Sequence, residues 1–197
     1  MLIELTGHPC SGKTYVLSES QYKGYLFTKY KGAFRNIFLV IVAIKFIFTD
    51  KLFRDLLDLV LLSNDSFYIK FILILNIAEK YYYALKLKDS KHKLIIDEGA
   101  VHILFNLLCT DSPLVWDQFE KKRIFSRLPH PQRLILLKTE ENIQIERLKN
   151  RGHKRMKDIH EFTRITRKIS GYIEMHFEGN IQIANGLDEF ESILSNE

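Results

Sequence analysis

Short apolar runs alternate along this chain with longer segments in which apolar positions recur every three or four residues. The short runs have the length and composition of buried strands and lie at residues 1–6, 93–96, 133–137 and 181–184. A helical pattern follows each of them. This alternation is typical of a parallel sheet covered by helices on both faces, so we predict a three-layer α/β fold.

A long helical pattern separates the first two of these strands. It covers residues 33–88, with a turn and N-cap composition at Ser63-Asn64-Asp65-Ser66. We interpret it as a helical insertion on the acceptor side, residues 33–90, within a single domain of residues 1–197. Tyr25–Thr28 is predicted as a further short strand.

Composition excludes disordered and membrane-spanning classes. The chain is 46% apolar and 27% charged, with nine glycines and four prolines. Its longest apolar stretch, residues 37–48, is shorter than the roughly 18 residues that a span requires. Two cysteines, Cys10 and Cys109, cannot form a disulfide framework. We therefore expect a cytoplasmic protein, and a homodimer is compatible with the sequence.

Positive charge is concentrated in residues 121–168. This segment holds 15 of the 29 Lys and Arg but only 5 of the 24 Asp and Glu, whereas the whole chain has a net charge of +5. Such a segment is typical of a site for phosphates, of a nucleic-acid surface, or of a solvated helical face. No recognition helix or aromatic RNA-binding motif is present, so we expect no nucleic-acid partner.

The segment Gly7-His8-Pro9-Cys10-Ser11-Gly12-Lys13-Thr14 fits the pattern G-x-x-x-x-G-K-[ST] in full. In such a loop, glycines let the backbone N–H groups point at one phosphate, and the following helix directs its positive end there. The pattern begins after a predicted strand and opens a helix, as the motif requires. We expect all eight residues to bind ATP, with Lys13 on the β- and γ-phosphates and the Thr14 hydroxyl on Mg²⁺.

Two carboxylates, Asp97 and Glu98, follow the second apolar strand. A strand beside the first one delivers an Asp near the metal in phosphate-loop proteins, so Asp97 is predicted as a Mg²⁺ ligand. Glu98 could activate a substrate hydroxyl, activate water, or cap the next helix. Glu98, His102 and Asn106 have i, i+4, i+8 spacing, which predicts one polar helix face toward the site.

Arginines recur every four residues at Arg147, Arg151 and Arg155, around Gly152. Guanidinium forks suit the oxygens of a transferring phosphoryl group. A surface basic helix would show the same spacing. We predict an arginine-bearing lid over residues 147–157 that excludes water, in which Arg151 and Arg155 act in catalysis.

With these motifs the chain resembles phosphate-loop kinases of the nucleoside monophosphate kinase superfamily, and thymidylate kinase in particular. The resemblance rests on residues 7–14 and 131–190. It implies that Arg147 or Arg151 flanks the adenine and that Asn185 and Gly186 line it.

The acceptor side departs from that pattern. Thymidylate kinases usually place Asp-Arg where this chain has Asp97-Glu98. A carboxylate there suits a free hydroxyl, as in enzymes similar to deoxynucleoside kinases, where a Glu serves as base. The candidate acceptor-binding residues are Arg35, His102, Arg123 and Arg127.

The predicted function is an ATP-dependent kinase that transfers the γ-phosphate to a hydroxyl or phosphate of a nucleoside, nucleotide or sugar-like acceptor. The alternative is an ATPase in which Glu98 activates water and a partner protein uses the energy. The lid favours the kinase, because a kinase must exclude water from its transferring group.

Overall fold

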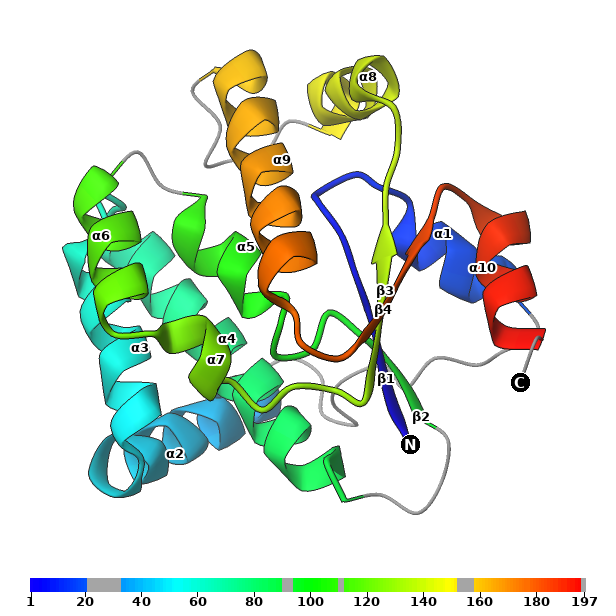
Figure 1. The fold of residues 1–197 in the computed structure, drawn as a ribbon. Helices are drawn as coiled ribbons and strands as arrows, with labels where there is room; N and C mark the ends of the chain where they lie inside the picture. The colour runs from blue at the N-terminus through cyan, green and yellow to red at the C-terminus, as the bar shows by residue number, and fades with distance from the viewer. Residues whose placement is uncertain (21–32, 90–93, 110–111, 152–157, 196–197) are drawn as a thin grey trace.

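The computed structural model describes residues 1–20, 33–89, 94–109, 112–151 and 158–195. One sheet contains four parallel strands in the order β2-β1-β3-β4 (Figure 1). The strands are β1 Leu2–Thr6, β2 Leu94–Asp97, β3 Arg133–Leu137 and β4 Asn180–Ala184. The predicted parallel sheet is confirmed.

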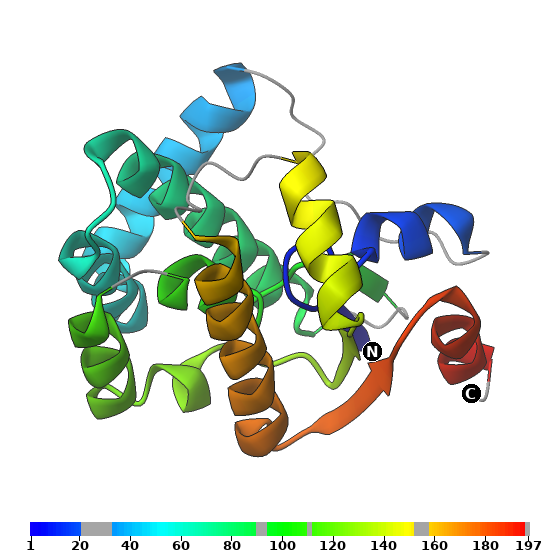
Figure 2. The same cartoon turned by 90° about the horizontal axis from the view of Figure 1, so that it is seen from above.

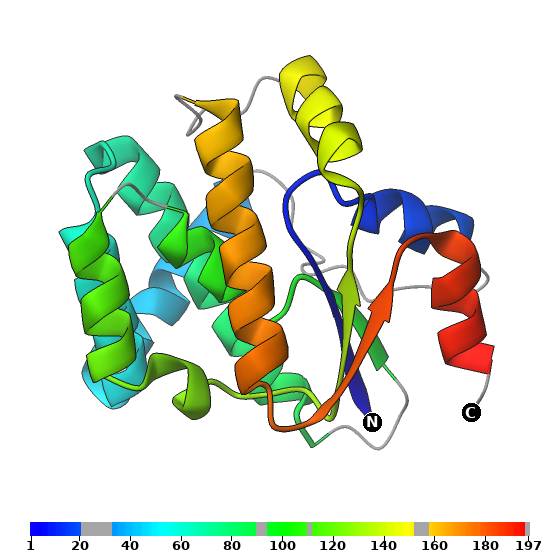
Figure 3. The same ribbon diagram turned by 45° about the horizontal axis from the view of Figure 1, so that its top comes forward.

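Helices cover both faces of this sheet, as Figures 1 and 3 show. One face packs on α1 (Lys13–Glu19) and α10 (Leu187–Ser195). The other face is covered by elements from the middle of the chain and by the long helix near its end. These are α4 (Phe67–Leu87), α5 (Ile103–Leu108) and α9 (Ile159–His176). The predicted three-layer arrangement is therefore confirmed.

Alternation along β1 gives each face of the sheet a different set of side chains. Ile3 and Leu5 are fully buried against the layer of α1 and α10. Glu4 and Thr6 point to the opposite layer, where they bond to the start of α5. A strand that is apolar on one side and polar on the other, yet wholly buried, can bring polar groups to a buried site.

The insertion between β1 and β2 is helical, as predicted. It contains α2 (Ala33–Thr49), α3 (Lys51–Leu62) and α4. Asp50 caps α3 and Ser66 caps α4 through side-chain oxygens that accept backbone N–H bonds, which explains where the helices break. The strand predicted at 25–28 lies outside the described residues.

The remaining helices are α6 (Pro113–Lys121), α7 (Ile124–Arg127) and α8 (Glu141–Arg151). Seen from above, α8 lies beside α9 and above the loop that follows β1 (Figure 2). Among the described residues, no helix combines the length and apolar character needed to cross a lipid bilayer.

Candidate functional site

The loop after β1 curls tightly before α1. Gly7 has no room for a side chain, because an added Cβ would lie 2.3 Å from the carbonyl oxygen of Leu137. Gly12 (φ +96°) and Cys10 (φ +65°) take left-handed backbone conformations. His8 and Ser11 are buried inside the loop. The loop therefore has the compact path that its sequence motif predicts.

Lys13 lies back across this loop. Its ammonium Nζ donates to the carbonyl oxygens of Gly7 at 3.1 Å and His8 at 3.3 Å, and it lies 3.5 Å from a carboxylate oxygen of Glu98. Burial lowers the pKa of Lys13, and the nearby carboxylates of Glu98 and Asp97 oppose that shift. The Lys13 ammonium group thus contacts backbone carbonyls of the loop on one side and the Glu98 carboxylate on the other.

Asp97 and Glu98 end β2 at the edge of the sheet from which the loop also leaves. Glu98 takes a left-handed backbone conformation, φ +59°, and its N–H donates to the carbonyl of Leu5 at 2.9 Å. The left-handed conformation of Glu98 ends the regular alternation of the strand. The side chains of Asp97 and Glu98 therefore do not simply point to opposite faces of the sheet. The two carboxylates consequently face different surroundings.

A buried carboxylate from β1 holds this turn in place. Glu4 accepts the backbone N–H groups of Val101 at 3.1 Å and His102 at 2.8 Å. An added Cβ on Gly99 would lie 2.6 Å from a Glu4 carboxylate oxygen, so only glycine allows this approach. Burial raises the pKa of Glu4 to about 7.

Three cationic or imidazole groups meet Glu98. Lys80 of α4 donates to its carboxylate at 3.0 Å and to its backbone carbonyl at 2.9 Å. Lys13 lies at 3.5 Å and His102 Nε2 at 3.4 Å. Burial alone would raise the pKa of Glu98, but these neighbours outweigh it and hold the pKa well below its ordinary value.

His102 links this carboxylate to β1. Its Nδ1 lies 3.0 Å from the Thr6 hydroxyl, and burial lowers its pKa well below the ordinary value. A neutral ring can accept the Thr6 hydroxyl proton at Nδ1, while its Nε2 lies 3.4 Å from a carboxylate oxygen of Glu98. Thr6 therefore contacts His102 on one side of the ring, and Glu98 lies on the other.

Asp97 has a different environment. Its Oδ1 is buried and has no hydrogen-bond partner, and burial together with the Glu98 carboxylate raises its pKa to about 6. Thr14 is exposed on the pocket wall. A carboxylate oxygen and a hydroxyl are both ligand types that Mg²⁺ accepts, although Asp97 is not among the residues that line the pocket.

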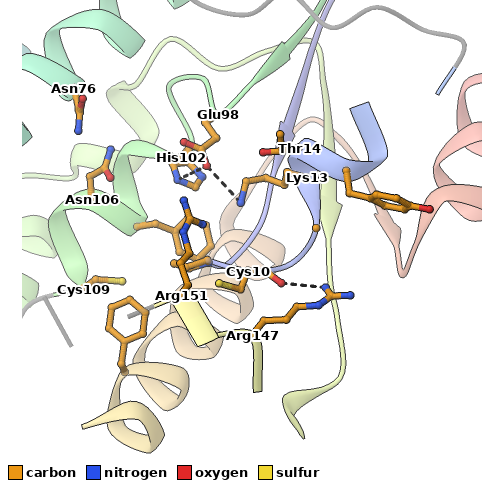
Figure 4. A pocket seen from close by; sticks show the side chains of 15 residues that line it. Cys10, Lys13, Thr14, Asn76, Glu98, His102, Asn106, Cys109, Arg147 and Arg151 are labelled. Atoms are coloured by element: carbon orange, nitrogen blue, oxygen red, sulfur yellow. Dashed lines mark hydrogen bonds and ion pairs between the residues drawn. The ribbon is translucent and has the colours of Figure 1, made fainter. Parts of the chain in front are cut away.

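A cavity of about 790 Å³ opens over these groups (Figure 4). One end is formed by the loop residues and the other by Asn76 of α4 and Asn106 of α5, with Glu98 and His102 between them. Phe105, Phe162 and Cys109 also line the cavity. The pocket thus joins an end formed by the G-x-x-x-x-G-K-[ST] loop to an end that has two side-chain amides.

Arginines of α8 border the same cavity. Arg147 Nη1 donates to the Cys10 carbonyl at 3.2 Å, and Arg151 extends into the pocket (Figure 4). Both are on the face of α8 that the four-residue spacing predicts. Arg155 and most of the predicted lid, residues 152–157, lie outside the described residues.

Several predicted residues are not brought to this cavity. Arg35 pairs with Glu79, and Arg127 pairs with Asp55 at 2.8 Å, so both guanidinium groups join helices of the insertion and its neighbours instead of lining the pocket. Arg123 is exposed at the start of α7, and it does not line the pocket either. None of these three arginines lines the cavity.

The loop after β4 also differs from expectation. The backbone and side-chain amides of Asn185 both donate to Glu189, at 2.9 Å each, which caps the start of α10. Asn185 and the adjacent Gly186 follow β4 at the same edge of the sheet as the phosphate loop, but they are not part of the cavity wall.

Glu98 and five of the eight loop residues predicted from the sequence line this cavity, whereas Lys80 and Glu4 were not predicted as site residues. Lys80 stands in the middle of a helical pattern, and Glu4 interrupts an otherwise apolar strand. Glu4 could have been recognised from the sequence, because a carboxylate inside a buried strand needs a polar partner. The partner of Lys80 lies 18 residues away across a turn that no local pattern predicts.

Comparison with known proteins gives a fold and no sequence family. No family profile matches the chain, and no curated protein has a matching sequence. Deoxyadenosine kinase from M. mycoides, solved with dCMP and dCDP, matches with a TM-score of 0.61 at 12% identity, covering 100% of this chain and 97% of that one. Thymidylate kinase from Candida albicans matches with a TM-score of 0.54 at 14% identity, covering 99% and 89%. The chain therefore has the fold of phosphate-loop nucleoside and nucleotide kinases.

Proposed function

We propose that this protein is an ATP-dependent kinase that phosphorylates the hydroxyl of a nucleoside-like acceptor. The observation that carries the proposal is the position of Glu98 between the phosphate loop and the end of the cavity formed by Asn76 and Asn106. A carboxylate in that place can accept a hydrogen bond from an acceptor hydroxyl that faces a bound γ-phosphate.

The acceptor end suits a nucleobase. Phe105 and Phe162 offer flat apolar surfaces, and the amides of Asn76 and Asn106 offer both donors and acceptors. The fold likeness to a deoxyadenosine kinase supports this class of acceptor. We assign no particular base.

Donor binding changes the charge around Glu98. Lys13 pairs with Glu98 in this structure and would pair with donor phosphates when they are present. Glu98 then loses one of its cations, so its affinity for a proton rises when an acceptor hydroxyl is to be oriented. Lys80 and His102 keep the carboxylate in position during this exchange.

The remaining groups stabilise the transferred phosphoryl. Arg151 extends into the cavity and would neutralise charge on its oxygens. Mg²⁺, held by the Thr14 hydroxyl and Asp97, would neutralise charge on the β- and γ-phosphates. We further propose that the enzyme works in the cytoplasm, where its two thiols, Cys10 and Cys109, stay reduced.

The test is ADP release from Mg-ATP, alone and with pools of nucleosides, nucleoside monophosphates, sugars and sugar phosphates. We expect a nucleoside pool to stimulate release, Lys13→Ala to abolish it, and Glu98→Gln to lower kcat by about 10²–10⁴-fold. Glu19→Gln, on the exposed end of α1, serves as the matched control and should leave kcat unchanged.

Steady release that no pool stimulates would contradict the kinase and favour an ATPase with Glu98 acting on water. Stimulation by nucleoside monophosphates alone would contradict the assignment of a free hydroxyl as acceptor, while it would leave phosphoryl transfer in place.

A further inference from the structure

A second, smaller pocket lies beside the phosphate loop. It has a volume of about 320 Å³ and is lined by the loop, by the segment after β3 and by α9, through His8, Lys138, Arg167, Ser170, Gly171 and Glu174. Among the described residues, it shares none of its lining with the larger cavity over Lys13 and Glu98. Because α9 and α1 cover opposite faces of the sheet, this pocket lies on the side of the loop away from α1.

His8 contributes an unsatisfied ring nitrogen to this pocket. The side chain is only 1% exposed, and burial lowers its pKa to about 4, so the ring is neutral and carries one proton. Its Nδ1 lies 3.3 Å from the carbonyl oxygen of Pro9, which can only accept, so the proton is on Nδ1. Nε2 is then an acceptor, and no group among the described residues donates to it. A buried acceptor in this state favours a ligand that brings a hydrogen-bond donor.

Arg167 of α9 contributes an unsatisfied donor. Its Nη2 donates to the Thr139 carbonyl at 2.8 Å, which holds the guanidinium group against the segment after β3. Its Nε is buried and makes no hydrogen bond within the described part of the chain. A carboxylate oxygen of Glu141 lies 3.6 Å from this Nε, beyond hydrogen-bond distance. A buried guanidinium N–H without an acceptor favours an anion.

The lining of this pocket has more positive than negative charge. Lys138 contacts both carboxylate oxygens of Glu174 at 2.8 Å, and Arg167 adds a second cation. An ammonium group has three donors, so one donor of Lys138 remains for a ligand. Glu141 faces Arg167 from outside the lining, where its side chain is 59% exposed and screened by solvent. The pocket therefore favours a small anion.

An acceptor and two donors in one pocket discriminate among anions. Hydrogen phosphate has a P–OH group, which can donate to His8 Nε2, and its other oxygens can accept from Arg167 and Lys138. Sulfate and the dianion of a phosphate monoester have no such proton. Either ion would place an oxygen lone pair against the lone pair of Nε2. The lining thus matches hydrogen phosphate better than it matches these two ions.

We propose that this pocket is a second anion site that binds hydrogen phosphate, with the P–OH group donating to His8 Nε2 and the other oxygens accepting from Arg167 and Lys138. Gly171 leaves space for the ion, because an added Cβ at this residue meets nothing within 4 Å. The site is separate from the larger cavity and does not depend on phosphoryl transfer.

The first test is calorimetric titration of inorganic phosphate at pH 8 into protein saturated with Mg-ADP, which keeps the phosphate loop occupied. We expect one phosphate to bind per chain. Sulfate and methyl phosphate should bind at least about tenfold more weakly, because neither has a proton to donate to His8.

Two variants locate the bound phosphate. Arg167→Met should abolish binding by removing a cation and the buried donor, and Gly171→Leu should abolish it by filling the pocket while both cations remain. Arg164→Met is the matched control, because Arg164 lies on the same helix, pairs with Glu161 and does not line the pocket. It should bind phosphate as the parent protein does, and circular dichroism checks that all three variants fold.

The second test follows the ring of His8 by nitrogen-15 NMR, with its signals assigned by their loss in His8→Gln. Phosphate should shift the Nε2 signal in the direction of an acceptor that gains a hydrogen bond, and sulfate should leave it in place.

Phosphate binding that Mg-ADP abolishes would assign the ion to the phosphate loop and overturn the proposal. Equal affinity for phosphate and sulfate, or binding that survives in Gly171→Leu, would overturn it as well. A pocket that holds only water would give a flat titration with the same consequence. If Mg-ADP itself fails to bind, the proposed kinase fails, while phosphate titration of Lys13→Ala still tests this pocket.

Discussion

The contact of Lys80 with Glu98 can be recognised only in the folded chain. Its ammonium group donates to both the backbone and the side chain of Glu98, and it is 8% exposed. A cation in that position stabilises the ionised carboxylate and keeps Glu98 pointing at the cavity. Lys80 is therefore a positioning residue that acts through Glu98.

We predict that Lys80→Met lowers kcat by about 10–100-fold and moves the acid limb of the pH–rate profile upward. The pKa of Glu98 should rise when this cation is removed, because Lys80 is one of the groups that lower it. The measurement is kcat against pH with the acceptor identified by the ADP assay. Lys86→Met on the same helix is the control. A lower kcat with an unmoved profile would mean that Lys80 is only structural.

Asp97 gives a second prediction at this scale. Its pKa, raised to about 6, means that the free protein holds a proton on this group at mildly acidic pH. A metal ligand must be ionised, so kcat/KM for Mg-ATP should fall as pH decreases through about 6. Asp97→Asn should remove this limb and weaken the dependence on Mg²⁺ concentration. Titration of Mg²⁺ at fixed ATP checks both effects, and an unchanged limb in the variant would exclude Asp97 as its source.

The phosphate loop could be predicted from the sequence because eight consecutive residues carry the whole motif. The four-residue spacing of Glu98 and His102 predicted that their side chains are neighbours on one face of a helix. The side chains are neighbours, but the two residues do not lie within one helix. Helix α5 begins only at Ile103, and the left-handed turn at Glu98 brings the two side chains to within 3.4 Å. Contacts such as Lys80 with Glu98 depend on how separate helices pack, and no local pattern contains that information.

At the scale of elements, the periodicity of apolar residues predicts the strands and helices. It does not predict the order of the strands in the sheet. Each strand is a short apolar run, and the helical insertion keeps its three- and four-residue spacing. Residues 1–6 and 133–137 are far apart in sequence, yet β1 and β3 are direct neighbours. Periodicity therefore predicts the layers, whereas the position of Glu4 opposite the start of α5 depends on the order of the strands.

The junction of β1 and its loop predicts contrasting effects of two glycine substitutions. Gly7→Ala should destabilise the fold and abolish ATP binding, because its Cβ would overlap the carbonyl of Leu137. Gly171→Ala, in the middle of α9, meets nothing within 4 Å and should stabilise the protein by about 0.5–1 kcal/mol. Urea unfolding and ATP titration of both variants measure this. Equal stability changes would contradict the packing described for the loop.

Glu4 makes stability depend on pH. Its pKa of about 7 in the folded chain lies above its ordinary value of 4.5, so folding takes up a proton between these values. The contribution of Glu4 to stability should therefore rise as pH falls from about 7 toward 4.5, by up to about 1.4 kcal/mol per pH unit, while the lowered pKa values of His8 and His102 act in the opposite direction.

Urea unfolding between these pH values, in the parent and in Glu4→Gln, measures this slope. The variant should lack the contribution of Glu4 near pH 7, while Asp97→Asn should keep it, because Asp97 with a pKa of about 6 is mostly ionised there. A slope that survives in Glu4→Gln would assign it to another group.

At the scale of the whole molecule, ion pairs join the helical insertion to the segment after α6. Arg127 and Lys122 pair with Asp55 of α3, at 2.8 Å and 3.1 Å. These groups lie in the same basic region that the sequence linked to anion binding. Part of its positive charge is used within the fold, which no count of charges along the chain could reveal.

We predict that Arg127→Met leaves the acceptor KM unchanged and lowers stability by no more than about 1 kcal/mol, since the pair is partly exposed. Arg151→Met, in the cavity, should instead lower kcat. Steady-state kinetics and thermal unfolding of both variants distinguish the two roles. An acceptor KM raised by Arg127→Met would restore Arg127 as an acceptor residue.

The pairing of Lys13 with Glu98 has a consequence for how the ligand-free protein binds anions. The loop cation already has an internal counter-ion, so a nucleotide replaces one anionic partner by another at this lysine. Arg151, by contrast, lies at the exposed end of α8 and is open to ions from solution. We therefore expect the ionic-strength dependence of nucleotide affinity to originate at Arg151 more than at Lys13. Inorganic sulfate and phosphate should be weak competitors of the nucleotide.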